Sequence, residues 1–363
     1  MLNEQEKQRY SRHITLDGFG LENQIKLKQA KVLVIGAGGL GCPIIQYLAA
    51  AGVGTIGVVD GDTISYSNLQ RQILYTPAQV GVLKVNAIKS FISQFNPEVT
   101  CHTYPTNITI ENAKNIVEKY DVVMDGSDNF ATRYLVNDIC HLLNKPLVFG
   151  SIFKFEGQVT VFHFRNGPSY RCLYPNPPAF GSVPACSEIG VLGVLPGIIG
   201  NFMALEVIKV ITGIGEVLNG KLLMVNTLSN KHQTITFNKS DVVVTSLMDN
   251  YQTFCGMPEK KESISVAELH ALMQESDVQL VDVREPNELE ICTIGGVNIP
   301  LNAIPSAESK LDINKSVYLL CHHGMRSAMA QKWLLENTGV VAINIEGGIH
   351  AWSIEIDTAI PVY

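Results

Sequence analysis

The sequence carries little charge and no concentration of positive charge. Charged residues make up 17% of its 363 residues, and the formal net charge is −7. No cluster of lysine and arginine stands out along the chain. Nucleic acids and anionic membrane surfaces are bound largely through such clusters. We therefore expect neither nucleic acid nor membrane as a main partner.

A secretory signal and a disulfide framework are also missing. The first residues are polar and charged, so they lack the apolar segment of a signal peptide. The eight cysteines are scattered and do not show the dense spacing of small secreted proteins. We therefore expect a reducing cytoplasm, in which thiols stay available for chemistry.

One apolar stretch, residues 189–211, has the length of a membrane span. It contains Pro196, Asn201, Glu206 and Lys209. Charged side chains at mid-membrane depth are costly. We therefore expect this stretch to form a buried helix of a globular domain.

Strand and helix patterns alternate along the first 240 residues. Apolar runs predict strands at 31–36, 55–60, 99–103, 121–124, 147–149 and 158–164, with helical patterns between several of them. This alternation predicts a Rossmann-like, doubly wound parallel α/β sheet. Further strands at 221–225 and 233–237 complete this domain, residues 1–240. A polar linker follows at 241–262, and a smaller α/β domain at 263–363 has strands at 278–285 and 317–321.

A glycine-rich turn follows the first of these strands. The segment GAGGLG places Gly36, Gly38 and Gly41 in G-x-G-x-x-G spacing between a strand and a helix. Such glycines let backbone amides approach phosphates at a helix N-terminus. Asp60 ends the next strand, where a carboxylate can hydrogen-bond ribose hydroxyls. Alone, this pattern is most typical of an NAD-dependent dehydrogenase.

The residues that follow favour a nucleoside triphosphate instead. Asn68, Arg71 and Gln72 come soon after Asp60, and Lys84 adds a second cation. Such a set of cations and amides suits a triphosphate better than a nicotinamide. After a later strand, DGSDNFATR supplies Asp125, Asp128 and Asn129, and an acidic residue there can hold Mg²⁺ on the phosphates.

With these motifs, the first 250 residues resemble the MoeB/ThiF family, relatives of ubiquitin-activating enzymes. The resemblance implies ATP-dependent adenylation of the C-terminal glycine of a ubiquitin-like sulfur-carrier protein of the MoaD/ThiS type. By motif, Asp60 corresponds to the ribose-binding acid and Asp128 to the magnesium-associated acid, while Asn68, Arg71 and Lys84 correspond to the phosphate-contacting set. Arg12 in RYSRH matches an arginine donated to the partner subunit's ATP site, which implies a homodimer.

The family's structural zinc site is incomplete in this sequence. Members often hold zinc with two C-x-x-C pairs. Here the first cysteine of each pair is replaced, by Ser169 before Cys172 and by Gln252 before Cys255. Because structural zinc takes four strong ligands, we expect no zinc.

Two cysteines are candidates for sulfur chemistry. Cys186 lies in PACSEIG, where several family members have a cysteine that takes part in the carrier's thioester or persulfide chemistry; the alternative is a loop cysteine without a role. Cys321 opens CHHGMRS between a strand and a helix, where loop amides and the helix dipole favour a thiolate or persulfide anion. His322, His323 and Arg326 are expected to add a positive field.

Residues 263–363 resemble a rhodanese domain, through LVDVREPNE, GGVNIPL and EGGIHAW as well as the Cys321 loop. The six-residue loop 321–326 matches the sulfur-handling members, and Asp282 is expected to be a structural acid. The fusion thus implies that Cys321 passes persulfide sulfur to the activated glycine, with a cysteine desulfurase or thiosulfate as sulfur donor. The alternatives are a rhodanese domain that only docks partners, and an NAD-dependent oxidoreductase with an appended sulfurtransferase.

Overall fold

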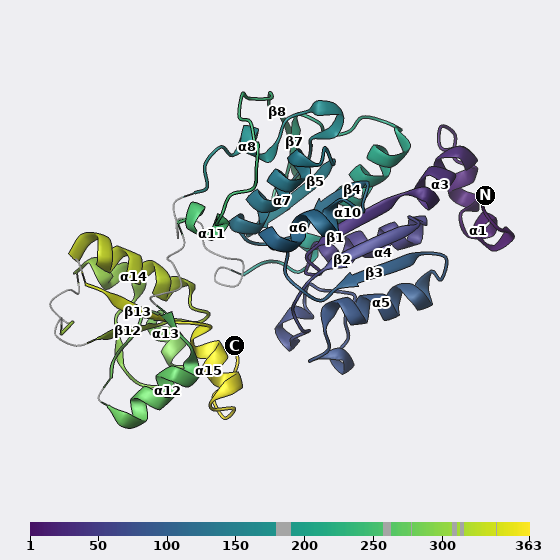
Figure 1. The fold of residues 1–363 in the computed structure, drawn as a ribbon. Helices are drawn as coiled ribbons and strands as arrows, with labels where there is room; N and C mark the ends of the chain where they lie inside the picture. Colours follow the sequence, from purple (N-terminus) through teal and green to yellow (C-terminus); the bar gives the residue numbers. More distant parts are fainter. Residues whose placement is uncertain (179–189, 257–262, 277, 307–310, 313–315, 339) are drawn as a thin grey trace. The chain divides into compact units, whose positions relative to one another are not determined.

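The computed structural model describes residues 1–178, 190–256, 263–276, 278–306, 311–312, 316–338 and 340–363. Contacts divide the chain into two units, which Figure 1 shows as ribbons. The first comprises Met1–Pro177 and Pro184–Tyr251, and the second comprises Pro178–Val183 and Gln252–Tyr363. Each unit has its own sheet and its own core. The predicted α/β fold is confirmed.

The first unit is built on an eight-stranded sheet with the order β3-β2-β1-β4-β5-β6-β7-β8. The strands are β1 (Lys31–Ile35), β2 (Thr55–Val59), β3 (Thr100–Tyr104), β4 (Val122–Asp125), β5 (Leu147–Phe153), β6 (Glu156–Phe162), β7 (Lys221–Asn226) and β8 (Lys231–Thr236). The first five strands pair in parallel, as expected. The last three pair antiparallel, so the sheet is mixed. The turn from β5 to β6 is too short for a parallel crossover.

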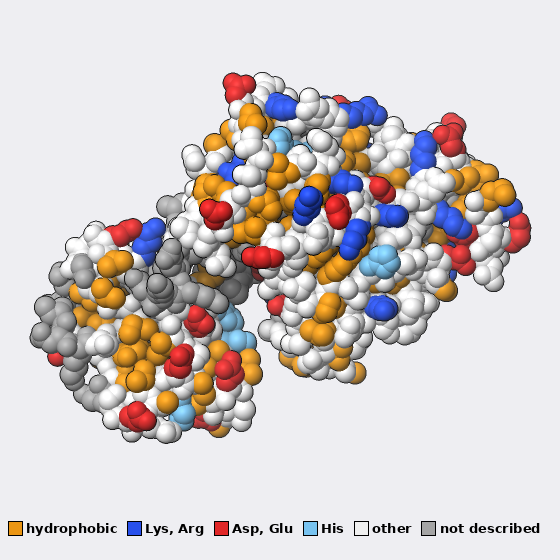
Figure 2. All heavy atoms as spheres, viewed as in Figure 1, with side chains coloured by type: hydrophobic (Ala, Val, Ile, Leu, Met, Phe, Trp, Pro, Cys, Tyr) orange, Lys and Arg blue, Asp and Glu red, His pale blue; other side chains and the backbone are white. Residues whose placement is uncertain are grey.

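Helices cover this sheet. They are α1 (Glu4–Arg9), α2 (Ser11–Ile14), α3 (Gly20–Gln29), α4 (Gly41–Ala51), α5 (Lys84–Phe95), α6 (Ile110–Val117), α7 (Phe130–Leu142), α8 (Tyr170–Leu173) and α10 (Val194–Thr212), with α11 (Tyr251–Phe254) at the boundary between the units. Short 3₁₀ turns are η1 (Tyr66–Asn68), η2 (Pro77–Gln79) and η3 (Phe164–Asn166). On the face that Figure 2 shows, positive and negative side chains are interspersed over this unit.

Helix α10 contains most of the long apolar stretch. Its length and composition would allow it to cross a membrane. In the structure Leu195, Ile199, Met203 and Val207 are buried in the core of the first unit. Glycine on the sheet lets the helix approach closely, because a Cβ on Gly157 would lie 2.3 Å from the side chain of Ile199. The stretch therefore forms a core helix, as the sequence indicated.

The register of the parallel strands brings three loops together at the carboxyl ends of the strands. Ile35 at the end of β1 pairs with Val59 of β2 on one side and with Asp125 of β4 on the other. Gly36, Asp60 and Gly126 follow these three residues directly. In open α/β sheets ligands bind at the carboxyl ends of the strands. The nucleotide motifs are therefore gathered at the edge where a site is expected.

The second unit has a five-stranded parallel sheet with the order β11-β10-β12-β13-β9. Its strands are β9 (Ser263–Ile264), β10 (Gln279–Asp282), β11 (Val297–Asn298), β12 (Val317–Leu320) and β13 (Ala342–Ile345). Its helices are α12 (Val266–Glu275), α13 (Pro286–Leu289), α14 (Met325–Thr338) and α15 (Gly348–Glu355), with the 3₁₀ segment η5 (Leu301–Ser306). The sequence predicted β10 and β12, the strands at the centre of the sheet, and not β9, β11 and β13.

Candidate functional site

The glycine loop between β1 and α4 is closely packed on one side and open on the other. Gly36 has φ +91°, and a Cβ there would lie 2.8 Å from the carbonyl oxygen of Gly126. A Cβ on Gly41 would lie 2.1 Å from the carbonyl oxygen of Gly36. At Gly38 a Cβ would meet only Gln72 Nε2, at 3.8 Å. The loop therefore keeps a cradle that larger residues would fill, next to the N-terminus of a long helix, as phosphate binding requires.

Asp60 fastens this loop to the end of β2. Its Oδ2 accepts a hydrogen bond from the backbone N–H of Ala37 at 2.7 Å, and its Oδ1 accepts one from that of Asp62 at 2.9 Å. Burial raises the pKa of Asp60, although Lys84, with Nζ 3.9 Å from Oδ1, opposes this. Asp60 is thus placed beside the glycine loop and helps to shape it.

The cation at Lys84 already has a partner within the unit. Lys84 begins α5 and is 5% exposed, and its Nζ lies 2.7 Å from Oδ2 of Asp62. The Asp62 side chain is 66% exposed. A phosphate at Lys84 would therefore compete with this exposed carboxylate. The sequence analysis missed Asp62, which lies in the same GDT segment that follows the ribose-site position.

The other two residues of the predicted phosphate set, and the neighbouring amide of Gln72, lie on and after the turn η1. Asn68 Oδ1 accepts a hydrogen bond from the backbone N–H of Ser65 at 3.2 Å. Arg71 is half-buried, and its Nη1 donates to the carbonyl of Ser67 at 3.0 Å. Gln72 is buried, and its Oε1 has no hydrogen-bond partner among the described residues. A buried amide oxygen without a partner beside Gly38 is consistent with a ligand site.

The DGSDNFATR segment contains a buried acid and an exposed one. Asp125 is 1% exposed, and its Oδ1 accepts from the N–H and the hydroxyl of Ser127 at 2.9 and 2.6 Å. Its Oδ2 is buried and has no partner among the described residues. Burial raises the pKa of Asp125, while Arg133 acts in the opposite direction. Asp128 is exposed on the loop that follows β4.

Asn129 and Arg133 show how this loop joins α7. Asn129 is the N-cap of α7, and its Oδ1 accepts from the N–H of Thr132 at 2.9 Å. The structure thus gives Asn129 a capping contact. Arg133 reaches back from the first turn, with Nη2 3.4 Å from the carbonyl of Ser127 and a buried Nε that has no hydrogen-bond partner in the described part of the chain. The sequence analysis missed Arg133, although it ends the same motif.

The structure does not bring Arg12 to the glycine loop of its own chain. Arg12 is exposed on α2, which packs on α3. These N-terminal helices lie at the amino ends of the strands: Gly54, just before β2, donates to the carbonyl of Leu27, and a Cβ on Gly52 would meet the Tyr10 ring at 2.4 Å. Figure 1 shows α1 and α3 beside the start of β1. Arg12 therefore lies at the amino ends of the strands, and the nucleotide motifs lie at their carboxyl ends.

The residues of the incomplete zinc site can be described in part. Cys172 Sγ accepts hydrogen bonds from the N–H groups of Ser169 and Ser240 at 3.3 Å, and it shares a further hydrogen bond with the hydroxyl of Ser169 at 3.2 Å. Burial tends to raise the pKa of Cys172, but these hydrogen bonds lower it. Cys255 is buried. Cys186, the first candidate sulfur cysteine, lies outside the described residues.

Cys321 lies in a loop that surrounds its sulfur with donors. The residue follows β12 and is 1% exposed. Its Sγ accepts hydrogen bonds from the N–H of Gly324 at 3.1 Å and from the hydroxyl of Ser327 at 3.2 Å. Gly324 has φ +90°, which favours glycine, and α14 begins at the next residue, Met325. This arrangement stabilises an anionic sulfur through backbone, hydroxyl and helix dipole.

The charged side chains of the Cys321 loop are arranged differently from expectation. Arg326 forms two hydrogen bonds with Glu288, at 2.6 and 2.7 Å. Burial tends to raise the pKa of Glu288, but the hydrogen bonds from Arg326 lower it to about 2. Burial lowers the pKa of His322 and lowers that of His323 to about 4. Burial thus disfavours the charged form of both imidazoles, and Arg326 is paired with a carboxylate, so neither observation supports a strong positive field from these side chains.

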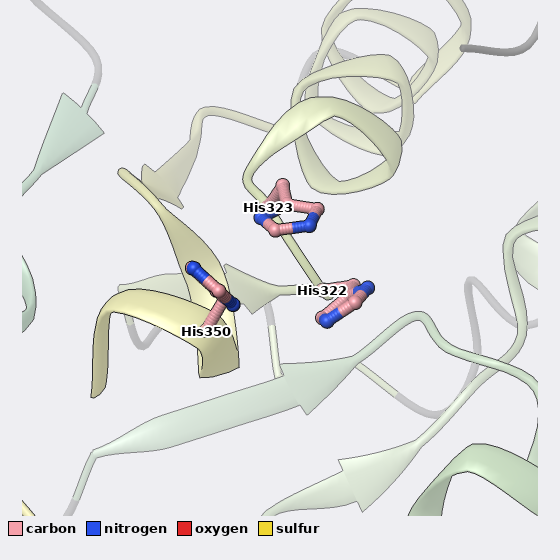
Figure 3. A group of neighbouring side chains, drawn as sticks. All are labelled: His322, His323 and His350. Atoms are coloured by element: carbon pink, nitrogen blue, oxygen red, sulfur yellow. The ribbon is translucent and has the colours of Figure 1, made fainter. Parts of the chain in front are cut away.

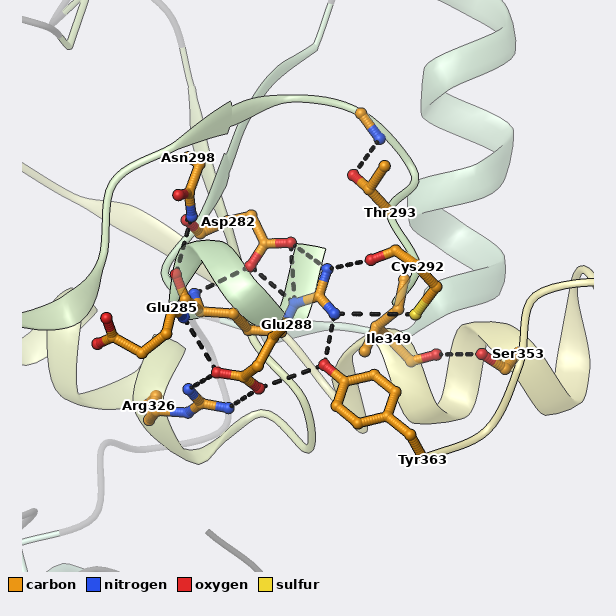
Figure 4. A network of polar contacts seen from close by, with 12 residues as sticks. Asp282, Glu285, Glu288, Cys292, Thr293, Asn298, Arg326, Ile349, Ser353 and Tyr363 are labelled. Carbon is orange, nitrogen blue, oxygen red and sulfur yellow. Dashed lines mark hydrogen bonds and ion pairs between the residues drawn. The ribbon is translucent and has the colours of Figure 1, made fainter. Parts of the chain in front are cut away.

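Asp282 has the contacts of a structural acid, as expected. Asp282 and Arg284 are both fully buried, and Arg284 Nη2 lies 2.6 Å from Asp282 Oδ2. Figure 4 shows that Tyr363 continues this network: it accepts from Arg284 Nη1 at 2.6 Å and donates to Glu288 at 3.2 Å. Removing one partner of a buried ion pair is strongly destabilising, because the other charge is left buried and unpaired. The network therefore links the core of the unit to the Cys321 loop through Glu288 and Arg326.

Comparison with known proteins assigns a family to each of the two units. The ThiF family matches residues 10–244, and the rhodanese-like domain matches residues 265–355. "Adenylyltransferase and sulfurtransferase MOCS3" of Anopheles gambiae is 42% identical over 100% of this chain and 90% of its own length. "Probable adenylyltransferase/sulfurtransferase MoeZ" of Mycobacterium tuberculosis is 42% identical over 100% of this chain and 96% of its own.

Solved structures support the fold of the first unit. The complex of Escherichia coli MccB with MccA-N7isoASN has a TM-score of 0.58 at 25% identity, over 66% of this chain and 75% of that one. MccB with ATP has a TM-score of 0.56 at 22% identity, over 68% of this chain and 75% of that one. The glycine loop, the Cys321 loop and the full-length relatives lead to one conclusion: the chain belongs to the ThiF family, carries a rhodanese-like domain behind the ThiF domain, and is an adenylyltransferase and sulfurtransferase.

Proposed function

We propose that this chain uses ATP to adenylate the C-terminal glycine of a ubiquitin-like sulfur-carrier protein of the MoaD/ThiS type, and that a persulfide on Cys321 then converts the glycine into a thiocarboxylate. The observation that carries the proposal is the cradle around Cys321 Sγ, on the same chain as an open glycine loop. The relatives that span the whole chain are named for both activities.

The nucleotide site would act by positioning and by charge. A carboxylate oxygen of the glycine attacks the α-phosphorus of ATP, and pyrophosphate leaves with the electrons of the bond that breaks. The glycine carboxylate is already ionised near neutral pH, so the step needs no general base. Arg71 and Lys84 offset the charge that gathers on the phosphates, and Asn68 donates to them.

Asp128 and the glycine loop complete the ATP site. Gly36, Gly38 and Gly41 leave room for the phosphates, Asp60 serves the ribose, and Asn129 orients the start of α7. Mg²⁺, when bound with ATP, supplies charge neutralisation at the phosphates. The exposed carboxylate of Asp128 and the unpaired, buried Oδ2 of Asp125 are oxygen ligands of the kind that this ion prefers.

Arg12 is proposed to act in the partner subunit of a homodimer. Its helix lies at the amino ends of the strands, whereas the glycine loop lies at their carboxyl ends. An arginine at that edge cannot serve the ATP site of its own chain without refolding the N-terminal helices. Its exposure supports donation to a second subunit.

Sulfur transfer would use two cysteines. The terminal sulfur of the Cys321 persulfide attacks the carbonyl carbon of the acyl-adenylate, and AMP leaves, which gives an acyl disulfide. A thiolate, which we assign to Cys186, then attacks Cys321 Sγ. The sulfur–sulfur bond breaks, the carrier thiocarboxylate leaves with the electron pair, and a disulfide joins the two cysteines. A thiol reductant restores both thiols. A cysteine desulfurase or thiosulfate would supply the persulfide sulfur, and a reducing cytoplasm is the fitting compartment.

The proposal is tested by separating the two half-reactions. Cys321→Ala should keep carrier-dependent ATP–pyrophosphate exchange, because the ATP motifs lie in the other unit. It should lose thiosulfate:cyanide sulfurtransferase activity and thiocarboxylate formation. Cys186→Ala should keep exchange and sulfurtransferase activity but form less thiocarboxylate. Mass spectrometry of the carrier detects the exchange of one oxygen for sulfur.

A full yield of thiocarboxylate from Cys321→Ala, without free sulfide, would contradict the coupling of the two domains. Loss of sulfurtransferase activity with normal thiocarboxylate formation would instead mean that the rhodanese-like domain only docks partners. The thiosulfate:cyanide assay on the unaltered chain should show turnover. Absence of turnover in this assay would likewise mean that the rhodanese-like domain only docks partners.

A further inference from the structure

Three histidines meet beside the Cys321 loop. His322 and His323 follow Cys321 directly, and His350 lies in the first turn of α15. The ligand nitrogens of the three imidazoles all lie within 4.8 Å of one another. Figure 3 shows the three rings around a shared space, two from the loop after β12 and one from α15. We propose that these three residues form a binding site for a divalent transition-metal ion of the zinc class.

The backbone fixes this meeting of two distant segments. The N–H of Ile349 donates to the carbonyl of Cys321 at 2.9 Å, and the N–H of His350 donates to the carbonyl of His322 at 3.1 Å. A Cβ on Gly348 would lie 2.2 Å from the Cys321 carbonyl oxygen, so only glycine permits this contact. The start of α15 is therefore held against the loop, and the three imidazoles are brought together by the fold itself.

Two of the imidazole nitrogens are buried without a partner. His322 Nε2 and His350 Nδ1 have no hydrogen-bond partner among the described residues. Most buried polar atoms in proteins are hydrogen-bonded, so two such nitrogens in one histidine cluster point to a missing ligand. The rings of His322 and His323 have centroids 4.1 Å apart, and those of His323 and His350 lie 4.5 Å apart.

The chemistry of the donor set selects the ion. Imidazole suits Zn²⁺, Cu²⁺, Ni²⁺ and Co²⁺, whereas Mg²⁺ and Ca²⁺ prefer oxygen. Zinc–nitrogen bonds are about 2.0–2.1 Å long, so nitrogens bound to one tetrahedral ion lie about 3.4 Å apart. The ligand nitrogens, within 4.8 Å of one another, would have to move closer together to bind one ion. Three protein ligands leave one position open to water or a small anion, as in zinc sites that are not purely structural.

This site differs from the zinc site that the sequence analysis judged incomplete, which involves Cys172 and Cys255. It also stands independently of the proposed adenylation, because all three ligands belong to the rhodanese-like unit. Two ligands belong to the loop that surrounds Cys321 Sγ, so an ion bound here restrains the loop that holds the persulfide.

The test is a titration of the full chain, without a histidine tag and after treatment with a chelator, with Co²⁺. Visible absorption should show one equivalent bound in a four-coordinate site, and Zn²⁺ should displace it. His323→Gln and His350→Gln should each weaken binding at least tenfold, because one of three ligands is lost. His323 is exposed, so its replacement leaves the fold intact. Far-UV circular dichroism and tryptophan fluorescence verify folding of both variants.

Two control variants sharpen the result. His270→Gln replaces a histidine of α12 outside the cluster and should bind Co²⁺ like the unaltered chain. Cys321→Ser should also bind it, since the sulfur is no ligand in this proposal. Unchanged affinity in His323→Gln and His350→Gln would mean that the three rings only pack together. Loss of binding in Cys321→Ser alone would assign the metal to the thiol. Either result would overturn the proposal.

Discussion

The ion pair between Glu288 and Arg326 gives the rhodanese-like unit a specific dependence on pH. Both side chains are 17% exposed, and the pair sits between the buried Asp282–Arg284 network and the Cys321 loop. Burial tends to raise the pKa of Glu288, but Arg326, together with hydrogen bonds from the Glu285 N–H and Tyr363, lowers it from 4.5 to about 2. Because the folded-state pKa is the lower one, the stabilisation is complete above pH 4.5 and is lost as the pH falls toward 2.

The size of the effect follows from the two pKa values. Their difference corresponds to at most about 3 kcal/mol of unfolding free energy, at 1.36 kcal/mol for each tenfold change. By pH 3 about 2 kcal/mol of this is gone. Glu288→Gln cannot titrate, and it leaves Arg326 without its carboxylate. We therefore expect the variant to be about 3 kcal/mol less stable than the unaltered chain at pH 7 and only about 1 kcal/mol less stable at pH 3.

Tryptophan fluorescence can follow this unit within the full chain. The sequence has two tryptophans, Trp333 and Trp352, and both lie in the rhodanese-like unit. Urea unfolding monitored by their emission at pH 7 and pH 3 gives the two differences in stability. Glu290→Gln, which removes an exposed carboxylate two residues away, should unfold like the unaltered chain at both values. A gap between Glu288→Gln and the unaltered chain that stays constant with pH would refute the reasoning.

Four further outcomes are expected. Asp128→Asn should lower carrier-dependent ATP–pyrophosphate exchange at least a hundredfold in a folded dimer, and near-normal exchange would remove Asp128 from the site. Inactive Arg12→Ala subunits mixed with inactive Asp128→Asn subunits should recover partial exchange activity; no recovery, with subunit exchange verified, would mean that the arginine does not act in trans. Elemental analysis after chelator treatment should find far less than one zinc per chain, whereas stoichiometric, chelator-resistant zinc would require ligands beyond Cys172 and its expected partners. Ser327→Ala should lower thiosulfate:cyanide turnover about tenfold by removing one donor to the Cys321 sulfur, and an unchanged rate would assign that stabilisation to the backbone alone.

The sequence predicted those parts of the fold that depend on local pattern. Apolar runs identified the central strands of both sheets, and the position of Cys321 between a strand and a helix was correct. The sequence analysis missed the two-residue strands β9 and β11, because they are too short to show an alternating pattern. The antiparallel part of the sheet was also missed, since pairing direction depends on the connection and not on the strand.

Side-chain pairing was the least predictable level. Sequence proximity suggested that Arg326, His322 and His323 together add positive charge near the sulfur. In the structure Glu288, 38 residues away in the sequence, forms an ion pair with Arg326. Likewise His350 joins the two loop histidines from the next strand–helix unit. No spacing rule indicates such contacts, because they depend on how α13 and α15 pack against the loop. Asp62 and Arg133, by contrast, lie within the recognised motifs and were open to prediction.

These pairings bear on how the Cys321 loop handles an anion. If free cations surrounded the sulfur, the loop would attract any anion and hold a released product strongly. Instead Arg326 is paired with Glu288, and burial lowers the pKa of both imidazoles, which disfavours their charged form. The stabilisation of an anionic sulfur then comes from short-range donors, the N–H of Gly324 and the hydroxyl of Ser327, with the N-terminus of α14 behind them. Such donors act only on an atom placed within hydrogen-bond reach. Without a metal ion at the histidine cluster, the loop therefore stabilises sulfur that is bonded to Cys321 and gives little hold on an anion that has left, which suits a residue that must give its sulfur away.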